Sequence, residues 1–153
     1  PIVFSENQDV SGHPLERRGI LHCVLDLSAG RRLHCMCVHL ALNEGARIRQ
    51  VGALIERMRE QVPEHEPLIV AGDFNDWRNR AGRRLTTETG LREAYREHHG
   101  RSARSFPSAL PLLCLDRIYT RGFTVAQAQV HHGTPWSRLS DHAALSADIE
   151  IGV

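Results

Sequence analysis

The sequence predicts an α/β fold in a single domain over residues 1–153, and two patterns carry this prediction. Apolar residues recur at three- and four-residue steps from Asn43 to about Val62, which is typical of an amphipathic helix. Short apolar runs of strand length lie before and after this stretch, so strands and helices are interleaved along the chain. A chain of 153 residues is also long enough to bury a hydrophobic core.

The N-terminal part of the chain is predicted to contain strands joined by turns. Residues 1–4 are apolar and strand-like, and the polar, turn-rich stretch 5–14 is expected to be a loop. Strands are predicted over 18–27 and 31–40. Because only a short turn over 28–30 separates them, these two strands should form a hairpin.

The predicted helix begins at its N-cap, Asn43, and has two different faces. The apolar face carries Ile48, Val51, Leu54, Ile55, Met58 and Val62. The opposite face carries Arg47, Arg49, Glu56, Arg57 and Glu60. We therefore expect the apolar stripe to lie on a sheet and the charged side chains to face solvent.

Short strands and helices alternate in the second half of the chain. Residues 68–71 are a continuous apolar run, as in a strand buried on both faces. A short helix is predicted over 83–89 with Gly90 as its C-terminal stop, and a further helical turn or two over 91–99. After a loop over 100–110, strands are expected over 113–120, 123–131 and 142–151.

Charge and cysteine content narrow the classes of function. The net charge is +1, so no strong positive field favours a general nucleic-acid binder. Arg78, Arg80, Arg83 and Arg84 form either a solvated helix face or a rim that recruits phosphate. The four cysteines have no disulfide-framework spacing, no run reaches transmembrane length, and the residues given contain no signal peptide, so a cytoplasmic protein without an integral membrane segment is expected.

Three short motifs carry the chemistry, each at the end of or inside an apolar run. They are Gly72-Asp73-Phe74-Asn75, Leu115-Asp116-Arg117-Ile118 and Ser140-Asp141-His142. Their carboxylates, carboxamide and histidine are suited to metal-assisted attack on a phosphate ester. If Asp73 and Asn75 continue an extended strand, both side chains point the same way and Phe74 points into the core. An Asx-turn closing the strand is the structural alternative.

In this order the motifs resemble the endonuclease/exonuclease/phosphatase superfamily, which has the DNase I-like fold. Val38-His39-Leu40 resembles the strand-end histidine of that family, and Ser105-Phe106-Pro107 resembles its threonine-phenylalanine-proline element. The resemblance implies a four-layer α/β sandwich with two packed mixed β-sheets. It also points to small bacterial members of the superfamily, on the pattern Gly-Asp-Phe-Asn-Asp-Trp and Leu-Asp-Arg-Ile-Tyr.

The resemblance also implies roles for individual residues. His142 would act at the scissile phosphate, as general base or as a phosphate-stabilising cation, and Asp116 would orient it. Asp73 and Asp141 would hold Mg²⁺ or Mn²⁺. Asn75 and His39 would bind the phosphate of the substrate. The catalytic residues that the resemblance implies are His39, Asp73, Asn75, Asp116 and His142.

The family opens with strands that carry an asparagine and a metal-binding glutamate, and no residue of this sequence matches them. We therefore expect the chain to be the C-terminal part of a longer protein, with the N-terminal portion of the sandwich missing. The alternative is a short natural variant that completes its sandwich with a second copy. An unpaired sheet edge would then favour a homodimer.

The motifs and the resemblance together predict a metal-dependent phosphoesterase in which water attacks phosphorus in line. The expected substrate is a nucleic acid, a nucleotide or a phospholipid-type phosphodiester. The alternative is a non-catalytic fragment or degenerate homologue without the metal-binding glutamate.

Overall fold

The computed structural model describes residues 1–13, 16–27 and 30–152, so Pro14 of the expected loop and residues 28–29 of the expected turn lie outside it. The main sheet has six strands in the order β1-β2-β3-β4-β6-β5. The strands are β1 (Ile2–Asp9), β2 (Gly19–Asp26), β3 (Arg32–His39), β4 (Leu68–Asp73), β5 (Arg92–Glu93) and β6 (Asp116–Arg121). β3 and β4 pair in parallel and every other neighbouring pair is antiparallel, so the sheet is mixed.

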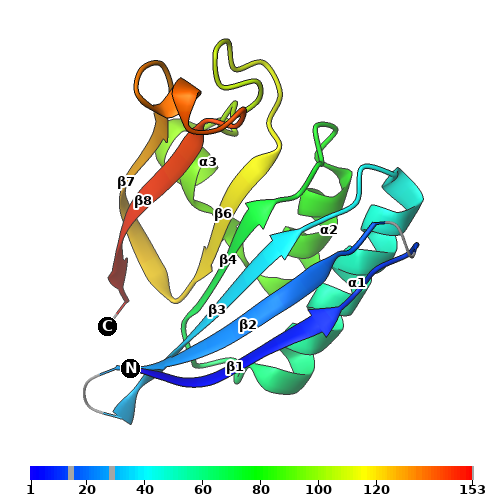
Figure 1. Cartoon of the computed structure of the whole chain (residues 1–153). Coiled ribbons are helices and arrows are strands. Elements are labelled where there is room, and N and C mark those ends of the chain that lie inside the picture. The colour runs from blue at the N-terminus through cyan, green and yellow to red at the C-terminus, as the bar shows by residue number, and fades with distance from the viewer. Residues whose placement is uncertain (14–15, 28–29, 153) are drawn as a thin grey trace.

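Helices and a second, smaller sheet complete the fold (Figure 1). The helices are α1 (Glu44–Gln61), α2 (Arg80–Thr89) and α3 (Ala94–His99), and η2 (Trp136–Arg138) is a short 3₁₀ turn. β7 (Phe123–His131) and β8 (Ala144–Ile151) pair in antiparallel fashion and form the second sheet. The predicted α/β class is confirmed, and the described part of the second sheet is a two-stranded antiparallel ribbon.

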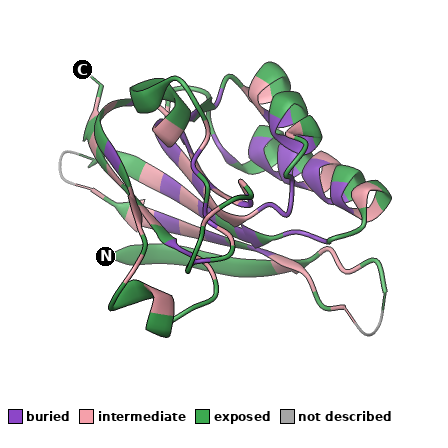
Figure 2. Ribbon diagram, turned by 90° about the horizontal axis from the view of Figure 1, so that it is seen from above, coloured by how far each residue is buried: buried purple, intermediate pink, exposed green. Residues whose placement is uncertain are grey.

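The core lies between the main sheet and the helices α1 and α2, whose inner faces are buried (Figure 2). Ile20, Met36 and Val38 of the strands pack with Leu54 and Met58 of α1 in one cluster of buried apolar side chains. The helix therefore lies on the sheet through the stripe of apolar residues that the sequence predicted. All four cysteines are free.

Two arginines that were expected on the solvent face of α1 are buried. Asn43 caps it as predicted, since its side chain accepts from the backbone N–H of Ala46. Arg47 and Arg57, however, are only 1 % and 8 % exposed. Long side chains can bury their stems and still find polar partners, and both guanidinium groups make several contacts. Ile48, on the expected apolar face, is 37 % exposed.

The stretch 5–9 was expected to be a loop and instead belongs to β1. Its residues are paired with β2 in a register that ends with Asp9 opposite Gly19. β1 lies at the edge of the sheet and is mostly exposed, so polar side chains occupy it without a burial cost. Glu6 and Gln8 are anchored by the guanidinium of Arg57. Edge pairing is a tertiary interaction that the hydrophobic pattern does not report.

Other boundaries differ by a few residues. α2 begins three residues before the expected start and ends at Gly90, whose left-handed backbone and N–H bond to Thr86 confirm the predicted stop. The expected helix over 91–99 is divided into β5 and α3. β7 has the bounds that were predicted. The homodimer through a sheet edge stays a prediction, with β1 as the exposed edge.

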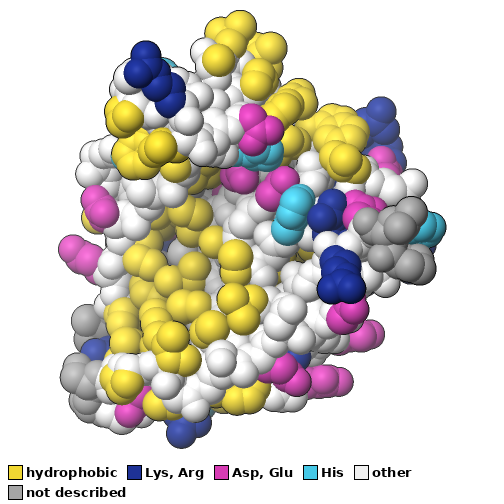
Figure 3. All heavy atoms as spheres, viewed as in Figure 1, with side chains coloured by type: hydrophobic (Ala, Val, Ile, Leu, Met, Phe, Trp, Pro, Cys, Tyr) yellow, Lys and Arg dark blue, Asp and Glu magenta, His cyan; other side chains and the backbone are white. Residues whose placement is uncertain are grey.

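The main-sheet face opposite α1 and α2 is largely apolar. Hydrophobic side chains gather between the two sheets in the view of Figure 3, where the surface is hollowed. Leu21 of β2 is 43 % exposed on this face. None of the helices in the described residues has the length and apolar character needed to cross a bilayer.

Candidate active site

Three strands place His39, Asp73 and Asp116 side by side. His39 ends β3 and lies opposite Asp73, which ends β4. Asp73 in turn lies opposite Asp116, the first residue of β6. Since side chains at paired positions share a face, all three point away from the helices at one end of the sheet. Nε2 of His39 lies 3.5 Å from Oδ2 of Asp73.

His142 joins this group from the loop before β8. Its Nδ1 lies 2.7 Å from Oδ2 of Asp116. When Nδ1–H donates to the carboxylate, the tautomer is set and Nε2 is left for a substrate or water. The pairing that the resemblance implied between Asp116 and His142 is therefore present in the structure.

The Ser105-Phe106-Pro107 element holds the His142 loop in place. The backbone N–H of Ala143 donates to the carbonyl of Ser105 at 2.7 Å, and the ring of Phe106 lies 4.9 Å from that of His142. The Ser105 hydroxyl, which is fully buried, accepts from the backbone N–H of Asp116 at 3.1 Å. One residue thus positions both members of the His142–Asp116 pair.

Burial and the crowding of charge together shift two pKa values at the site. Burial raises the pKa of Asp73 and the nearby charge of Asp116 adds to it, against the opposing effects of the Asn75 N–H, His142 and His39. Burial by itself lowers the pKa of His142, but the hydrogen bond and charge of Asp116 outweigh it, so the net pKa is raised.

Asn75 does not continue the strand as expected. Its φ is 49°, in the left-handed region, and its N–H donates to Oδ1 of Asp73 at 2.8 Å. This is the Asx-turn that was the structural alternative. The Asn75 side chain is nevertheless turned to the site, where Nδ2 donates to the carbonyl of Leu40 at 2.9 Å and one amide hydrogen stays uncommitted. Phe74 is fully buried, as predicted.

His39, Asp73, Asn75 and His142 line one cleft of about 390 Å³, and Asp116 lies behind His142. The residues that line it are Arg18, His39, Leu42, Asp73, Asn75, Trp77, Phe106, Leu113, Leu115 and His142. Sequence reasoning missed Arg18 and the apolar walls Leu42, Leu113 and Leu115. Leu42 and Leu113 are exposed, so they left no burial pattern to detect.

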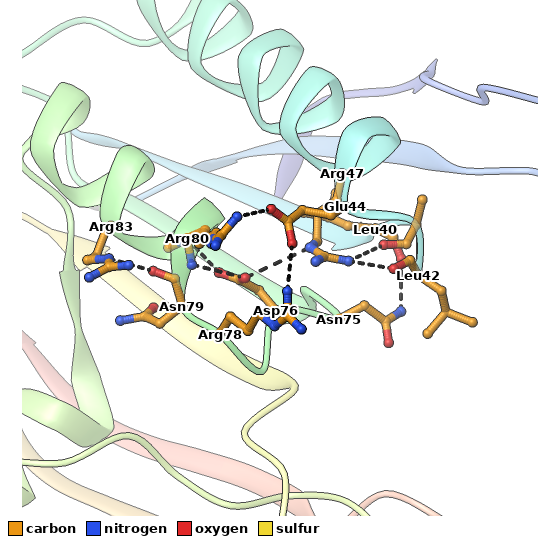
Figure 4. A network of polar contacts seen from close by, with 12 residues as sticks. Leu40, Leu42, Glu44, Arg47, Asn75, Asp76, Arg78, Asn79, Arg80 and Arg83 are labelled. Atoms are coloured by element: carbon orange, nitrogen blue, oxygen red, sulfur yellow. Dashed lines mark hydrogen bonds and ion pairs between the residues drawn. The ribbon is translucent and has the colours of Figure 1, made fainter.

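The loop between β4 and α2 is fixed by a buried ion pair (Figure 4). Asp76 is fully buried and accepts from the backbone N–H groups of Arg80 and Gly82. Nε of Arg47 lies 3.9 Å from Oδ1 of Asp76, and its Nη1 donates to the carbonyls of Ala41 and Leu42. Arg47 therefore ties the loop with Asn75 to the end of β3.

Arg47 also lies beneath Trp77, with the guanidinium carbon 5.3 Å from the ring centroid. Trp77 is 45 % exposed and lines the cleft, so the anchored indole is one of its walls. Trp136, the other tryptophan near a site motif, instead lies 5.0 Å from the ring of His131.

Three arginines of the cluster after the Asp73 loop make ion pairs, and Arg83 donates its Nε to the carbonyl of Asn79. Arg78 and Arg80 both contact Glu44 at the start of α1 (Figure 4), and Arg84 pairs with Glu88. No member of the cluster lines the cleft, which favours the solvated helix face among the two interpretations. Arg117 is a buried structural cation, with Nη1 2.9 Å from Oε2 of Glu93.

Asp141 is exposed beside His142, and its backbone carbonyl accepts from Ser108. Its charge contributes to the raised pKa of His142. In the described ranges, no three His, Cys, Asp or Glu side chains converge on a point that could hold a metal ion. The half-buried Asp73 beside Asp116 still has the donor chemistry that Mg²⁺ favours, because that ion takes few carboxylates and completes its shell with water and substrate phosphate.

A mixed sheet whose strand ends gather carboxylates and imidazoles in one cleft defines an α/β protein with an acid–base site. The family model described as "Endonuclease/Exonuclease/phosphatase family" matches residues 3–142. The chain therefore belongs to this family.

Known relatives are longer than this chain. "Uncharacterized protein YbhP" of Escherichia coli (strain K12) is 45 % identical over 152 residues, which are 99 % of this chain and 60 % of YbhP. The endonuclease/exonuclease/phosphatase from Bacteroides vulgatus has a TM-score of 0.81 at 21 % identity, over 99 % of this chain and 66 % of that structure. A mannosyl-6-phosphatase from Bacteroides thetaiotaomicron has a TM-score of 0.78 at 17 % identity, over 99 % and 67 %. At these identities the two solved structures support the fold.

Proposed function

We propose that the whole protein is a phosphoesterase that hydrolyses a phosphate ester by in-line attack of water. The observation that carries the proposal is the contact of 2.7 Å between Asp116 and His142, directly beside His39, Asp73 and Asn75 in one cleft. An acid–imidazole pair of this kind can exchange a proton with a reacting oxygen and stabilise the charge that develops.

Each residue has a definite part in the proposal. His142 faces the phosphate through Nε2, and Asp116 holds its tautomer and orientation. Asn75 donates its uncommitted amide hydrogen to a phosphoryl oxygen, without adding a charge that would repel the anion. His39, whose side chain is 58 % exposed, approaches the phosphate from the end of β3.

A divalent cation, Mg²⁺ or Mn²⁺, is part of the proposal, with Asp73 and Asp141 as its ligands in this chain. When bound, such an ion polarises phosphoryl oxygens as a Lewis acid. The raised pKa of Asp73 supports a cation near it, because positive charge would relieve the repulsion between the carboxylates of Asp73 and Asp116. The family's metal-binding glutamate would come from residues outside this sequence.

The cleft favours an ester with an apolar or aromatic part. Leu42, Trp77, Phe106 and Leu113 wall it, and Arg18 adds a guanidinium to its lining. A nucleotide base, a sugar or a lipid backbone could pack on these walls, so nucleic acid, nucleotide and phospholipid-type phosphodiesters all stay within the proposal. With a net charge of +1, avid binding of duplex DNA is the least favoured of these.

The test is hydrolysis of bis(p-nitrophenyl) phosphate with Mg²⁺ or Mn²⁺, by this chain and by a protein of the length of YbhP. The expected result is metal-dependent turnover by the longer protein that falls at least about 100-fold in His142→Ala and Asp116→Asn. His98→Gln, on the exposed end of α3, is the matched control and should retain activity.

The second candidate is a non-catalytic member that binds phosphate esters. It is favoured by the lack of a three-ligand metal group among the described residues. Turnover that is absent in the longer protein, or that persists in His142→Ala, would exclude the proposed phosphoesterase. Retained binding of the ester without turnover would then support the non-catalytic candidate.

A further inference from the structure

Four loops surround the mouth of the cleft at one end of the main sheet. These loops, which we call the rim loops, are 40–43 after β3, 74–79 after β4, 106–115 before β6 and 132–143 between β7 and β8. The strand ends from which the first three leave are paired with one another, and His142 of the fourth contacts Asp116. The rim loops therefore lie together around the candidate active site, at the upper end of the molecule in Figure 1.

The rim loop 106–115 is apolar throughout. Its sequence, Phe-Pro-Ser-Ala-Leu-Pro-Leu-Leu-Cys-Leu, contains no charged residue. Leu110 and Leu112 are 67 % and 58 % exposed, and Leu113 beside the cleft is exposed as well. Loops at a protein surface are usually rich in polar residues, whereas a group of exposed apolar side chains is typical of a binding surface. This loop therefore has the composition of a contact site.

The other three rim loops also expose large apolar side chains. Leu42 and Trp77 are exposed on the loops after β3 and β4, and Trp136 and Leu139 on the loop before β8, where Leu139 is 74 % exposed. Both tryptophans of the chain thus lie on rim loops. In Figure 3, hydrophobic side chains at this end of the molecule lie on either side of the histidine and carboxylate side chains. The apolar contact site therefore encircles the cleft.

Buried polar contacts hold the rim loops in this arrangement. Ser108 is buried, and its N–H and hydroxyl donate to the carbonyls of Asp141 and Ser140 at 2.6 and 2.7 Å, which joins the loops 106–115 and 132–143. Arg47 joins the other two loops, because it donates to the carbonyl of Leu42 and lies beneath the ring of Trp77. The exposed side chains therefore project from backbone that is fixed in the fold.

A lipid bilayer fits this surface better than a protein partner does. A protein seated on all four rim loops would close the cleft to substrate, whereas a bilayer contacts the loop tips and also presents phosphate esters in its headgroups. Leucine side chains suit the boundary between acyl chains and headgroups, and the indole ring of tryptophan, with its polar N–H, is enriched at that depth. Arg138, next to Leu139, makes no ion pair with any described residue, so its charge is available to anionic headgroups.

We propose that the rim loops dock the protein on the surface of a phospholipid bilayer. The exposed leucines and both indoles enter the headgroup region, and the cleft faces the lipids. This inference deepens the proposed function and rests on it in one respect, because it selects a bilayer phospholipid as the ester that is hydrolysed. Docking itself requires only the rim loops and no turnover.

The test is binding to vesicles of equimolar phosphatidylcholine and phosphatidylglycerol, by this chain and by a protein of the length of YbhP. Both should sediment with the vesicles. Because its two tryptophans lie on rim loops, the fluorescence of this chain should also shift to shorter wavelength when lipid is added. Leu110→Ser and Leu139→Ser, which lie outside the lining of the cleft, should each weaken vesicle binding about 5-fold. The matched control is Ile2→Ser, at the far end of β1 and almost as exposed as Leu110, which should not change it.

Each of the other outcomes overturns the proposal. Vesicle binding by this chain but not by the longer protein would show that further residues cover the rim loops. Equal weakening by Ile2→Ser and Leu110→Ser would indicate general adhesion of apolar surface. A fluorescence shift that grows with protein concentration in the absence of lipid would assign the rim loops to contact with a second copy of the chain. Lack of binding by both proteins would exclude docking outright.

Docking and hydrolysis can fail separately. His142→Ala should retain vesicle binding, because docking does not depend on the His142–Asp116 pair. Leu110→Ser and Leu139→Ser should retain the turnover of bis(p-nitrophenyl) phosphate, a soluble ester that needs no bilayer. Vesicle binding by a protein that is inactive on this ester would therefore support the docking surface and exclude the phosphoesterase, and turnover without vesicle binding would do the reverse.

Discussion

Asp73 and Asp116 stand directly opposite each other on β4 and β6, and both carboxylates lie on the sheet face that carries the cleft. Like charges at opposed positions of neighbouring strands are destabilising. The pKa of Asp73 is raised, first by burial and then by the charge of Asp116. The site therefore carries a local cost to stability, of the kind that binding of a cation would relieve.

Replacement of Asp73 by asparagine should stabilise the fold at pH 7. Because the folded-state pKa of Asp73 is raised, its carboxyl favours folding at low pH and this contribution is lost as pH rises through that pKa. Asp73→Asn should raise the free energy of unfolding at pH 7 by about 0.5–1 kcal/mol. Urea denaturation measures this, and Asp141→Asn, at an exposed carboxylate, should change it by less. A destabilised Asp73→Asn would contradict the electrostatic account.

The pKa of His142 should depend on Asp116. Burial lowers this pKa, and the hydrogen bond and charge of Asp116 reverse the shift. Asp116→Asn removes the charge that counteracts burial, so the pKa of His142 should fall relative to the wild type. A histidine NMR titration of this chain measures it. Asp141→Asn should produce a smaller fall, because the Asp141 charge is the least of the raising effects; equal falls would argue against the direct contact.

His22 should make the protein sensitive to acid. Burial lowers the pKa of His22 to about 4, with further lowering by the charges of Arg57 and His34 and an opposing effect of Glu6. The unfolded chain therefore takes up a proton below pH 6.5 that the folded chain refuses until about pH 4. Stability should fall by up to about 3 kcal/mol across this window.

Denaturant unfolding at several pH values between 4 and 7 measures this loss. His22→Gln should flatten the acid dependence, and His132→Gln, at an exposed histidine, should keep it. An unchanged slope in His22→Gln would show that another group causes the acid sensitivity.

Gly72 should be essential for the close pairing of β3 and β4 beside the site. Its φ is 140°, and a Cβ there would lie 1.9 Å from the carbonyl oxygen of Val38. Gly72→Ala should therefore cost more than about 3 kcal/mol or prevent folding. Gly133→Ala, which also has a positive φ but no atom within 4 Å, should cost only about 1 kcal/mol. Thermal unfolding compares them, and similar losses would refute the steric explanation.

Elements with strong internal patterns were predictable. The apolar period and the cap at Asn43 located α1, and β7 has the predicted bounds. The element that was missed depends on backbone hydrogen bonds to a neighbouring strand. β1 runs through residues 5–9 because they pair with β2, and a polar edge strand has no hydrophobic alternation to detect.

In the site, too, the residue types were predictable and the backbone geometry was not. The motifs pointed to His39, Asp73, Asn75, Asp116 and His142. The structure brings four of them to one cleft, and Asp116 contacts His142 from behind. The left-handed backbone of Asn75 was not predicted, because it depends on hydrogen bonds to Asp73 and to the distant Leu40.

The sequence by itself determined the α/β class, the amphipathic helix and the kinds of side chain that gather at the strand ends, because periodicity and residue chemistry are local properties. The tertiary structure decided which charges are buried and what faces them. The helical pattern predicts Arg47 on the solvent face of α1, yet this residue is buried. It contacts Asp76 and so fixes the loop between β4 and α2. Tyr119 is likewise buried only because α2 meets β6, since its hydroxyl packs against Gly82, a residue far away in the chain.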